Sequence, residues 1–127
     1  DPEMSRGLGD VYKRQVYDLA LKNLELSTKE ITDGYTIKTA ANMVESDFKV
    51  NGYNLIHALG HGVGLEVHEL PFIRLKNEAN FKENMVIADE PGIYLPGKYG
   101  IRIEDTLLVT KDGSERLTKS ERGYVVI

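Results

Sequence analysis

The amino-acid sequence predicts an α+β fold in which helices pack on one face of a mostly antiparallel sheet. Two observations carry this prediction: the first half holds two stretches with the apolar spacing of helices, and the second half holds short β-rich runs divided by turns. Helices that precede the strands, rather than alternating with them, are typical of α+β domains. The length of 127 residues suits one domain with one core.

One apolar stripe predicts a first helix from about residue 16 to residue 31. Its members have the spacing of one helical face: Val16, Leu19, Ala20, Leu24 and Ile31. The sequence Thr-Asp-Gly at 32–34 ends this pattern. Residues 1–15 have neither helical nor strand periodicity, so they are predicted to be a tail. We expect this tail to be foreign, for example translated vector or adapter sequence joined to a truncated reading frame.

A second apolar stripe predicts a helix over about residues 37–50. Its members are Ile37, Ala40, Ala41, Val44 and Phe48. Thr36 can cap the start of this helix, and the pair Asn51-Gly52 stops it. The run at 53–59, which follows directly, is predicted to be a strand.

Glycine occupies every second position after that run, at Gly60, Gly62 and Gly64. A backbone without side chains lets another group approach closely. Downstream, the β-rich runs 85–94 and 100–110 flank the turn sequence LPGKYG and are predicted to form an antiparallel pair.

Two more short runs, around 116–118 and 124–127, follow the turn KDGS and complete the predicted strands.

Composition and charge exclude several classes of function. The net charge of -4 and the pI of about 5.4 give no basic surface for nucleic acid or an anionic membrane. No apolar run approaches the roughly 18 residues that span a bilayer, and no targeting signal is visible. The chain has no cysteine, so a metal would be held by His, Asp, Glu or backbone oxygen. These features favour a cytoplasmic protein.

All three histidines, His57, His61 and His68, lie within a single stretch, HALGHGVGLEVHELP. A single histidine at a strand end is more often a hydrogen-bonded structural residue than a ligand, but a group of three favours a site. The interspersed glycines argue against a helix here. Phe72 stands where the helical zinc-protease motif needs its second histidine, which excludes that motif.

Two glutamates in the β-rich runs are candidate ligands. Glu90 lies inside a run that is otherwise fit for burial, and a buried carboxylate is costly unless it is paired or binds a metal. Strand alternation places Arg102 and Glu104 on one face, opposite two isoleucines. The alternative is an edge strand with its polar side in water. Asp89 points away from Glu90 and is predicted to be structural.

One histidine and two glutamates form a ligand set that suits Mn, Co, Zn or Fe, and carboxylates can bridge two such ions. From about residue 16 to 127 the sequence resembles the pita-bread metallopeptidases, the family of methionine aminopeptidases, Xaa-Pro aminopeptidases and prolidases. The motifs HALGHGVGLEVHELP, NMVIADEPGIY and GIRIEDTLLVT occur in the family's order and spacing. The resemblance implies that residues 16–127 are the C-terminal part of a truncated catalytic domain, with the C-terminal half of a pita-bread fold.

The resemblance also implies roles for individual residues. His61, Glu90 and Glu104 match metal ligands, and Glu104 matches the one that bridges two divalent ions. The chemistry it implies is metal-assisted hydrolysis, in which Glu90 moves protons. His68 matches the histidine that contacts the substrate carbonyl or the scissile nitrogen and would stabilise the oxyanion.

Two further residues bear on the substrate. His57 matches a histidine that lines the pocket in proline-directed members of the family. Arg102 matches an arginine that those members carry two residues before the bridging glutamate, whereas methionine aminopeptidases usually differ there. The expected function is therefore hydrolysis of Xaa-Pro bonds, as by an aminopeptidase P or a prolidase, on a peptide with proline at its second position.

The family pattern needs five protein ligands, of which three have counterparts here. Two upstream aspartates and an earlier histidine have no match before residue 16. We expect the isolated chain to bind metal weakly, to be inactive, and to associate with itself, for instance as a homodimer, through apolar surface meant for the missing half.

Two alternatives remain open. One is a methionine aminopeptidase, which Arg102 disfavours. The other is a pita-bread protein without peptidase activity, such as creatinase, which uses no metal, or a protein with a binding role. Members of that second group typically lose the ligands that this sequence keeps.

Overall fold

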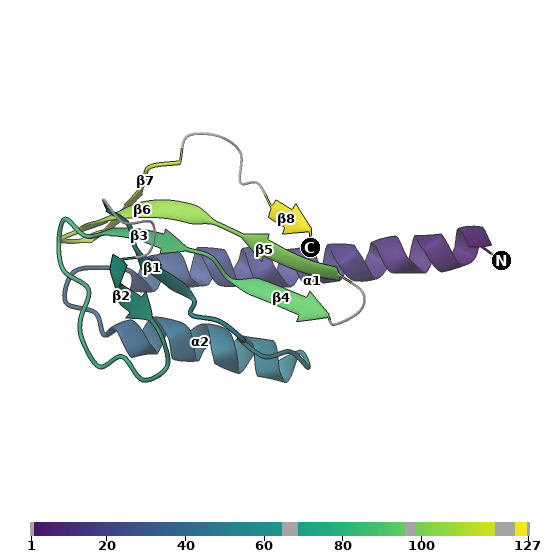
Figure 1. Ribbon diagram of the computed structural model, residues 1–127, viewed down its shortest axis with the longest axis horizontal. Coiled ribbons are helices and arrows are strands. Elements are labelled where there is room, and N and C mark those ends of the chain that lie inside the picture. Colours follow the sequence, from purple (N-terminus) through teal and green to yellow (C-terminus); the bar gives the residue numbers. More distant parts are fainter. Residues whose placement is uncertain (1, 65–68, 96–98, 119–123, 127) are drawn as a thin grey trace.

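The computed structural model describes residues 2–64, 69–95, 99–118 and 124–126, with side chains described for 12–64, 70–95 and 100–118. Two helices, α1 (Pro2–Glu30) and α2 (Ile37–Val50), precede all the strands. They lie side by side along the strands, and the N-terminal part of α1 projects beyond them (Figure 1). Neither helix in the described part of the chain is apolar enough over a sufficient length to cross a bilayer.

The strands form two sheets in which every pairing is antiparallel. The larger sheet has the order β2-β1-β3-β6-β7 and the smaller has the order β4-β5-β8. The strands of the larger sheet are β1 (Gly60–Gly62), β2 (Glu69–Ile73), β3 (Val86–Asp89), β6 (Asp105–Thr110) and β7 (Gly113–Arg116). Those of the smaller sheet are β4 (Gly92–Leu95), β5 (Tyr99–Ile103) and β8 (Tyr124–Val126).

One long hairpin joins the two sheets. Its first arm is β3 followed by β4, and its second arm is β5 followed by β6, so each predicted run is divided into two strands. In the larger sheet Asp89 pairs with Asp105, and in the smaller sheet Gly92 pairs with Arg102. Glu90 therefore lies in the interruption of the first arm, and Glu104 lies in the interruption of the second. The predicted antiparallel pair is confirmed, with a break that its sequence pattern did not indicate.

The second helix has its predicted bounds, but the first does not. The helix predicted from about residue 16 begins at Pro2, so its predicted start is wrong. The residues at 12–15 are helical and exposed, which explains why they lack an apolar stripe: the stripe marks the part of a helix that is buried. Thr36 is the N-cap residue of α2, but its hydroxyl makes no capping hydrogen bond.

The strand predicted at 53–59 is also wrong, because none of these residues lies in a strand. The backbone N–H of Leu55 donates to Glu45 Oε2 on α2 at 2.8 Å, so a helix side chain satisfies it in place of a neighbouring strand. The last two short strands, β7 and β8, belong to different sheets, and β7 begins at Gly113.

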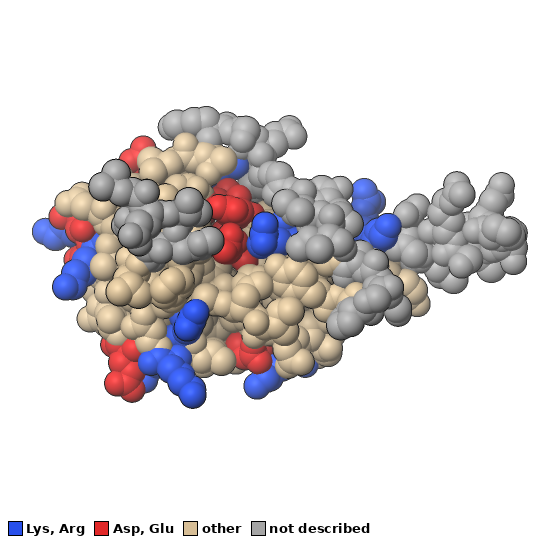
Figure 2. All heavy atoms as spheres, viewed as in Figure 1, with Lys and Arg blue, Asp and Glu red and all other residues tan. Residues whose placement is uncertain are grey.

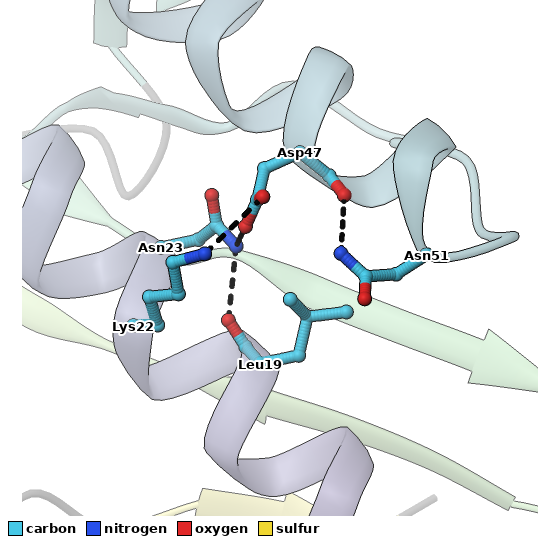
Figure 3. Close-up of polar contacts among 5 residues, drawn as sticks. All are labelled: Leu19, Lys22, Asn23, Asp47 and Asn51. Carbon is cyan, nitrogen blue, oxygen red and sulfur yellow. Dashed lines mark hydrogen bonds and ion pairs between the residues drawn. The ribbon is translucent and has the colours of Figure 1, made fainter.

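The core lies between the helices and the sheets and fixes their relative positions. Its largest fully buried side chains include Phe48 of α2, Phe81 of the connection before β3, and Leu24 of α1. The helices are also joined by polar contacts: Asp47 accepts hydrogen bonds from Asn23 Nδ2 at 2.8 Å and from Lys22 Nζ at 3.3 Å (Figure 3). This helical layer packs against the strands that carry the candidate site.

Candidate metal and substrate site

The three predicted metal ligands line one cavity of about 440 Å³. His61 comes from β1, Glu90 follows β3, and Glu104 lies between β5 and β6. The other lining residues are Val63, Gly64, Ala88, Arg102 and Thr106. Figure 2 shows acidic side chains grouped with a basic one near the middle of one face of the molecule. The interrupted hairpin thus brings together residues that are far apart in the sequence.

The imidazole of His61 is oriented by its own strand. Nδ1 lies 3.0 Å from the carbonyl oxygen of Gly62, and because a carbonyl only accepts, Nδ1 carries the proton. In the neutral ring, the lone pair of Nε2 then faces Glu90 Oε1 at 3.4 Å. Two acceptors facing each other are stabilised by a proton or a cation between them. An Nδ1–H bonded to a backbone carbonyl is also the usual second contact of a metal-binding histidine.

The two glutamates bring two carboxyl groups to the wall of the same cavity. The backbone N–H of Glu90 donates to the carbonyl of Leu59 at 2.8 Å, which holds the start of the interruption against β1. Burial raises the pKa of Glu104 above its ordinary value, and the negative charge of Glu90 raises it further, while Arg102 and His61 oppose the shift. A cation between the two carboxylates would relieve their repulsion.

The donor chemistry of this cavity fits a divalent cation, but the described residues form only part of a coordination sphere. One imidazole nitrogen and two carboxylates are suitable ligands for Mn, Co, Zn or Fe. Within the described ranges, no group of three His, Asp or Glu side chains is close enough to hold an ion by itself. His61 and Glu90 are the two that meet, and Glu104 lines the same cavity.

The model of the metallopeptidase family M24 matches residues 5–111, which is most of the chain. The chain belongs to metallopeptidase family M24. The match begins within residues 1–15, and the foreign origin of that segment stays a prediction.

Several proteins are similar to the M24 chain in sequence and in structure. A Xaa-Pro dipeptidase of Pyrococcus furiosus is 45% identical over 112 residues, which are 87% of this chain and 32% of the relative. A solved prolidase structure from Pyrococcus furiosus has a TM-score of 0.82 at 45% identity, covering 86% of this chain and 33% of the other. An X-Pro aminopeptidase structure from Thermotoga maritima has a TM-score of 0.83 at 38% identity, covering 88% and 32%.

These structures confirm the predicted α+β, pita-bread fold of the M24 chain. The chain spans about a third of the length of the relatives it matches.

The other predicted site residues of the M24 chain lie in different places. Arg102 lines the cavity with the glutamates. His57 lines a second cavity, and its ring nitrogens contact the Ala58 carbonyl oxygen at 2.5 Å and the Tyr94 hydroxyl at 2.9 Å. Because the carbonyl only accepts, Nδ1 donates to it, and in the neutral ring Nε2 accepts from Tyr94. His68 lies outside the described residues.

Tyr94 is a site neighbour that sequence reasoning missed. It lies on β4 opposite Gly100 of β5, and a Cβ added at Gly100 would come within 2.6 Å of its ring. A Cβ at Gly92 would come within 2.8 Å of the His57 ring and 2.6 Å of the Tyr94 hydroxyl. Burial raises the pKa of Tyr94, while the charge of Arg102 opposes the shift. The period-two spacing of Gly92 and Tyr94 was the signal that could have placed these two residues on the same face of β4.

Gly60 is one of the three glycines at which the sequence predicted that another group approaches the backbone closely. A Cβ at this position would lie 2.1 Å from the backbone oxygen of Ala88, on the neighbouring strand β3. The group that approaches this glycine is therefore a strand of the sheet and not a ligand. The contact sets β1 close to β3 beside His61 and Glu90.

Asp89 is structural, as predicted, and lies on the helix side of β3. It is fully buried, and its Oδ2 accepts a 2.6 Å hydrogen bond from Ser27 Oγ of α1. Its other oxygen has no hydrogen-bond partner among the described residues. Burial raises the pKa of Asp89 to about 8; the hydrogen bond from Ser27 lowers it, and the charge of Asp105 adds to the rise. The neutral carboxyl therefore anchors the strand next to Glu90 onto α1.

Proposed function

We propose that this chain is the C-terminal part of the catalytic domain of a dinuclear-metal exopeptidase that hydrolyses Xaa-Pro bonds, of the aminopeptidase P or prolidase type. The observation that carries the proposal is the placement of Glu90 and Glu104 at the matching interruptions of one hairpin, in a cavity shared with His61. The names of the relatives, an Xaa-Pro dipeptidase and an X-Pro aminopeptidase, support this substrate class.

Three side chains of this chain would hold the metal ions. His61 offers Nε2, Glu90 offers a carboxylate 3.4 Å away, and Glu104 offers the bridging carboxylate. Two divalent ions, Mn, Co, Zn or Fe, would lower the pKa of a water molecule and polarise the scissile carbonyl. The pKa of Glu104, raised mainly by burial and then by the charge of Glu90, supports this role, because a bound cation would keep such a carboxylate ionised.

The remaining site residues would act on the substrate. Glu90, 18% exposed, is accessible enough to take a proton from the attacking water and pass it to the leaving amine. Arg102, on the wall of the same cavity, would orient a peptide with proline at its second position. His68 would stabilise the charge that develops on the carbonyl oxygen, and His57 would line the substrate pocket.

The isolated chain would be inactive because two aspartate ligands are proposed to lie in an upstream segment. We therefore expect weak metal binding by these 127 residues alone. Self-association, such as a homodimer, and a cytoplasmic location remain parts of the same proposal.

The test uses the longer protein that joins this chain to an upstream half. With Mn²⁺ present it should cleave Ala-Pro much faster than Ala-Ala, and EDTA should abolish that activity. Glu104→Gln should remove most of the activity, whereas Glu115→Gln, an exposed change on β7, should leave it intact. Equal cleavage of both dipeptides, or full activity in EDTA, would overturn the proposal.

A further inference from the structure

A buried glutamate of α2, Glu45, contacts the segment that carries His57. Glu45 is only 9% exposed, and its Oε2 accepts the 2.8 Å hydrogen bond from the backbone N–H of Leu55. Leu55 precedes His57 by two residues. A carboxylate at a buried position is costly unless charge-assisted hydrogen bonds offset the loss of water. The carboxylate of Glu45 therefore holds the backbone close to a proposed site residue.

The two oxygens of this carboxylate have different partners, so their effects can be separated. Oε1 lies 3.3 Å from Nζ of Lys49, one turn further along the same helix, and the Lys49 side chain is 64% exposed. An exposed ion pair of this kind contributes little to stability. Oε2 instead joins α2 to a segment that lies outside the helix. The ion pair is thus a contact within the helix, whereas the hydrogen bond fixes the segment.

Residues 53–59 form neither helix nor strand, so individual hydrogen bonds set the path of this segment. At its start the N–H of Tyr53 donates to a carbonyl of α2, and at its end the N–H of Leu59 donates to a carbonyl of β2, each at 2.8 Å. The hydrogen bond from Leu55 lies between these two anchors. Its loss would leave the Leu55 N–H without this acceptor and release the backbone that leads to His57.

The His57 ring has little room to move with that backbone. Its Nε2 lies 2.9 Å from the Tyr94 hydroxyl, and the two rings meet edge to face with their centroids 5.4 Å apart. A Cβ added at Gly92 would come within 2.8 Å of Nε2, so the ring also lies close to the backbone of β4. The hydrogen bond with Tyr94 therefore requires the backbone at 55–57 to keep its position.

We propose that Glu45 is a positioning residue for His57: by accepting from the N–H of Leu55, it keeps the His57 ring in its hydrogen bond with Tyr94. Glu45 is not among the described residues that line either cavity, so it acts through the segment and not on a ligand. Its effect on substrate rests on the proposed function, in which His57 lines the substrate pocket. The placement of the ring does not, and it can be measured without metal or substrate.

The first test measures the His57 ring in the 127-residue chain, in EDTA, by NMR of ¹⁵N-labelled histidine at alkaline pH, where the rings are neutral. A His57→Gln variant identifies its signals among the three histidines. In the parent, the ring should be a single tautomer with its proton on Nδ1. Glu45→Met removes the acceptor of Leu55 and should give a mixture of both tautomers, and Glu45→Ala should do the same. Glu45→Gln keeps an oxygen that can accept and should restore the single tautomer.

Two control variants separate this role from a general loss of stability. Lys49→Met removes the ion pair at Oε1 but keeps the acceptor of Leu55, so the tautomer should not change. Asp47→Ala weakens the contact of the same helix with α1 and should also leave the His57 ring unchanged. A single tautomer in both Glu45→Met and Glu45→Ala would overturn the proposal, as would mixed tautomers in Asp47→Ala.

The second test measures cleavage of Ala-Pro by the longer protein with Mn²⁺. Glu45→Met should raise KM about fivefold or more and change kcat less than about twofold, because a displaced His57 weakens substrate binding and not the chemical step. Lys49→Met and Asp47→Ala should leave both constants unchanged. A fall in kcat at constant KM would contradict the positioning role. If the parent cleaves Ala-Pro no faster than Ala-Ala, the proposed function fails, and the NMR result alone decides the role of Glu45.

Discussion

Asp89 faces Asp105 directly across the ladder between β3 and β6, and both carboxyl groups are fully buried. Asp105 accepts a 3.0 Å hydrogen bond from the charged side chain of Arg116. Asp89 instead meets the hydroxyl of Ser27, and its pKa is raised to about 8, mainly by burial. The two opposed acids therefore have different partners: Asp105 meets a cation, and Asp89 meets a hydroxyl group.

This difference predicts a pH dependence of stability. The folded-state pKa of Asp89 is higher than its ordinary value of 3.8, so the folded chain keeps a proton that the unfolded chain loses. The contribution of Asp89 is therefore complete below about pH 4 and is lost as the pH rises toward 8, with a slope of at most about 1.4 kcal/mol per pH unit. Urea unfolding at pH 5 and pH 8 should show the loss.

Asp89→Asn supplies the control for this dependence, since an amide stays neutral at every pH. The stability difference between the variant and the parent should grow in favour of Asp89→Asn as the pH rises. Parallel pH profiles of the two proteins would show that Asp89 does not titrate in this range.

The close approach at Gly60 predicts a severe packing defect. Gly60→Ala would place a methyl group 2.1 Å from the backbone oxygen of Ala88, which cannot rotate away. We expect a loss of about 3 kcal/mol in the free energy of unfolding. Gly113→Ala is the matched control, because a Cβ there meets nothing within 4 Å, and it should change stability by less than about 0.5 kcal/mol. Similar effects of the two substitutions in urea unfolding would contradict this account.

The polar contact between α1 and α2 predicts a moderate loss of stability when its acceptor is removed. Asp47→Ala removes the acceptor of both Asn23 and Lys22 and should lower the free energy of unfolding by about 1 to 2 kcal/mol (Figure 3). Asn23 Nδ2 keeps its 3.0 Å hydrogen bond to the carbonyl of Leu19, which limits the loss. Thermal unfolding measures both this loss and its control, Asp18→Ala, which changes an exposed position of α1 and should be nearly neutral.

The proposed ligands predict which substitutions reduce metal affinity. In calorimetric titrations of the longer protein with Mn²⁺, His61→Ala and Glu104→Gln should each weaken binding about tenfold or more, since each removes a proposed ligand. Glu115→Gln removes one negative charge from an exposed site on β7 and should have little effect. Unchanged affinity in His61→Ala would show that the ligand assignment is wrong.

The sequence predicted the elements whose burial follows a simple period. The stripe of Ile37, Val44 and Phe48 is fully buried, and α2 has its predicted bounds. The start of α1 could not be predicted this way, because an exposed helix leaves no apolar period at residues 12–15. The strand predicted at 53–59 failed because its backbone bonds to a helix side chain, a long-range contact that a local pattern does not contain.

The candidate site shows the same division between local and long-range information. Motifs and strand alternation indicated Glu90 and Glu104, and the structure places both on one cavity with His61. The hydrogen bond between His57 and Tyr94 could not be predicted, because it joins residues 37 positions apart. It also depends on Gly92 and Gly100, where a side chain would occupy the space of the Tyr94 ring or hydroxyl. His57 and His61 line different cavities.

The hairpin that passes between the sheets at Glu90 and Glu104 has a consequence for how ligands of this site can be found. Both arms of the hairpin pass from the larger sheet to the smaller one at matching positions. A group that bridges the two carboxylates there would also link one sheet to the other. Such a group binds the folded chain and not the unfolded chain. The free energy of unfolding therefore increases with the logarithm of the free concentration of the group. The melting temperature should therefore report occupancy, and a thermal-shift screen of cations and peptides can rank ligands without any catalytic turnover.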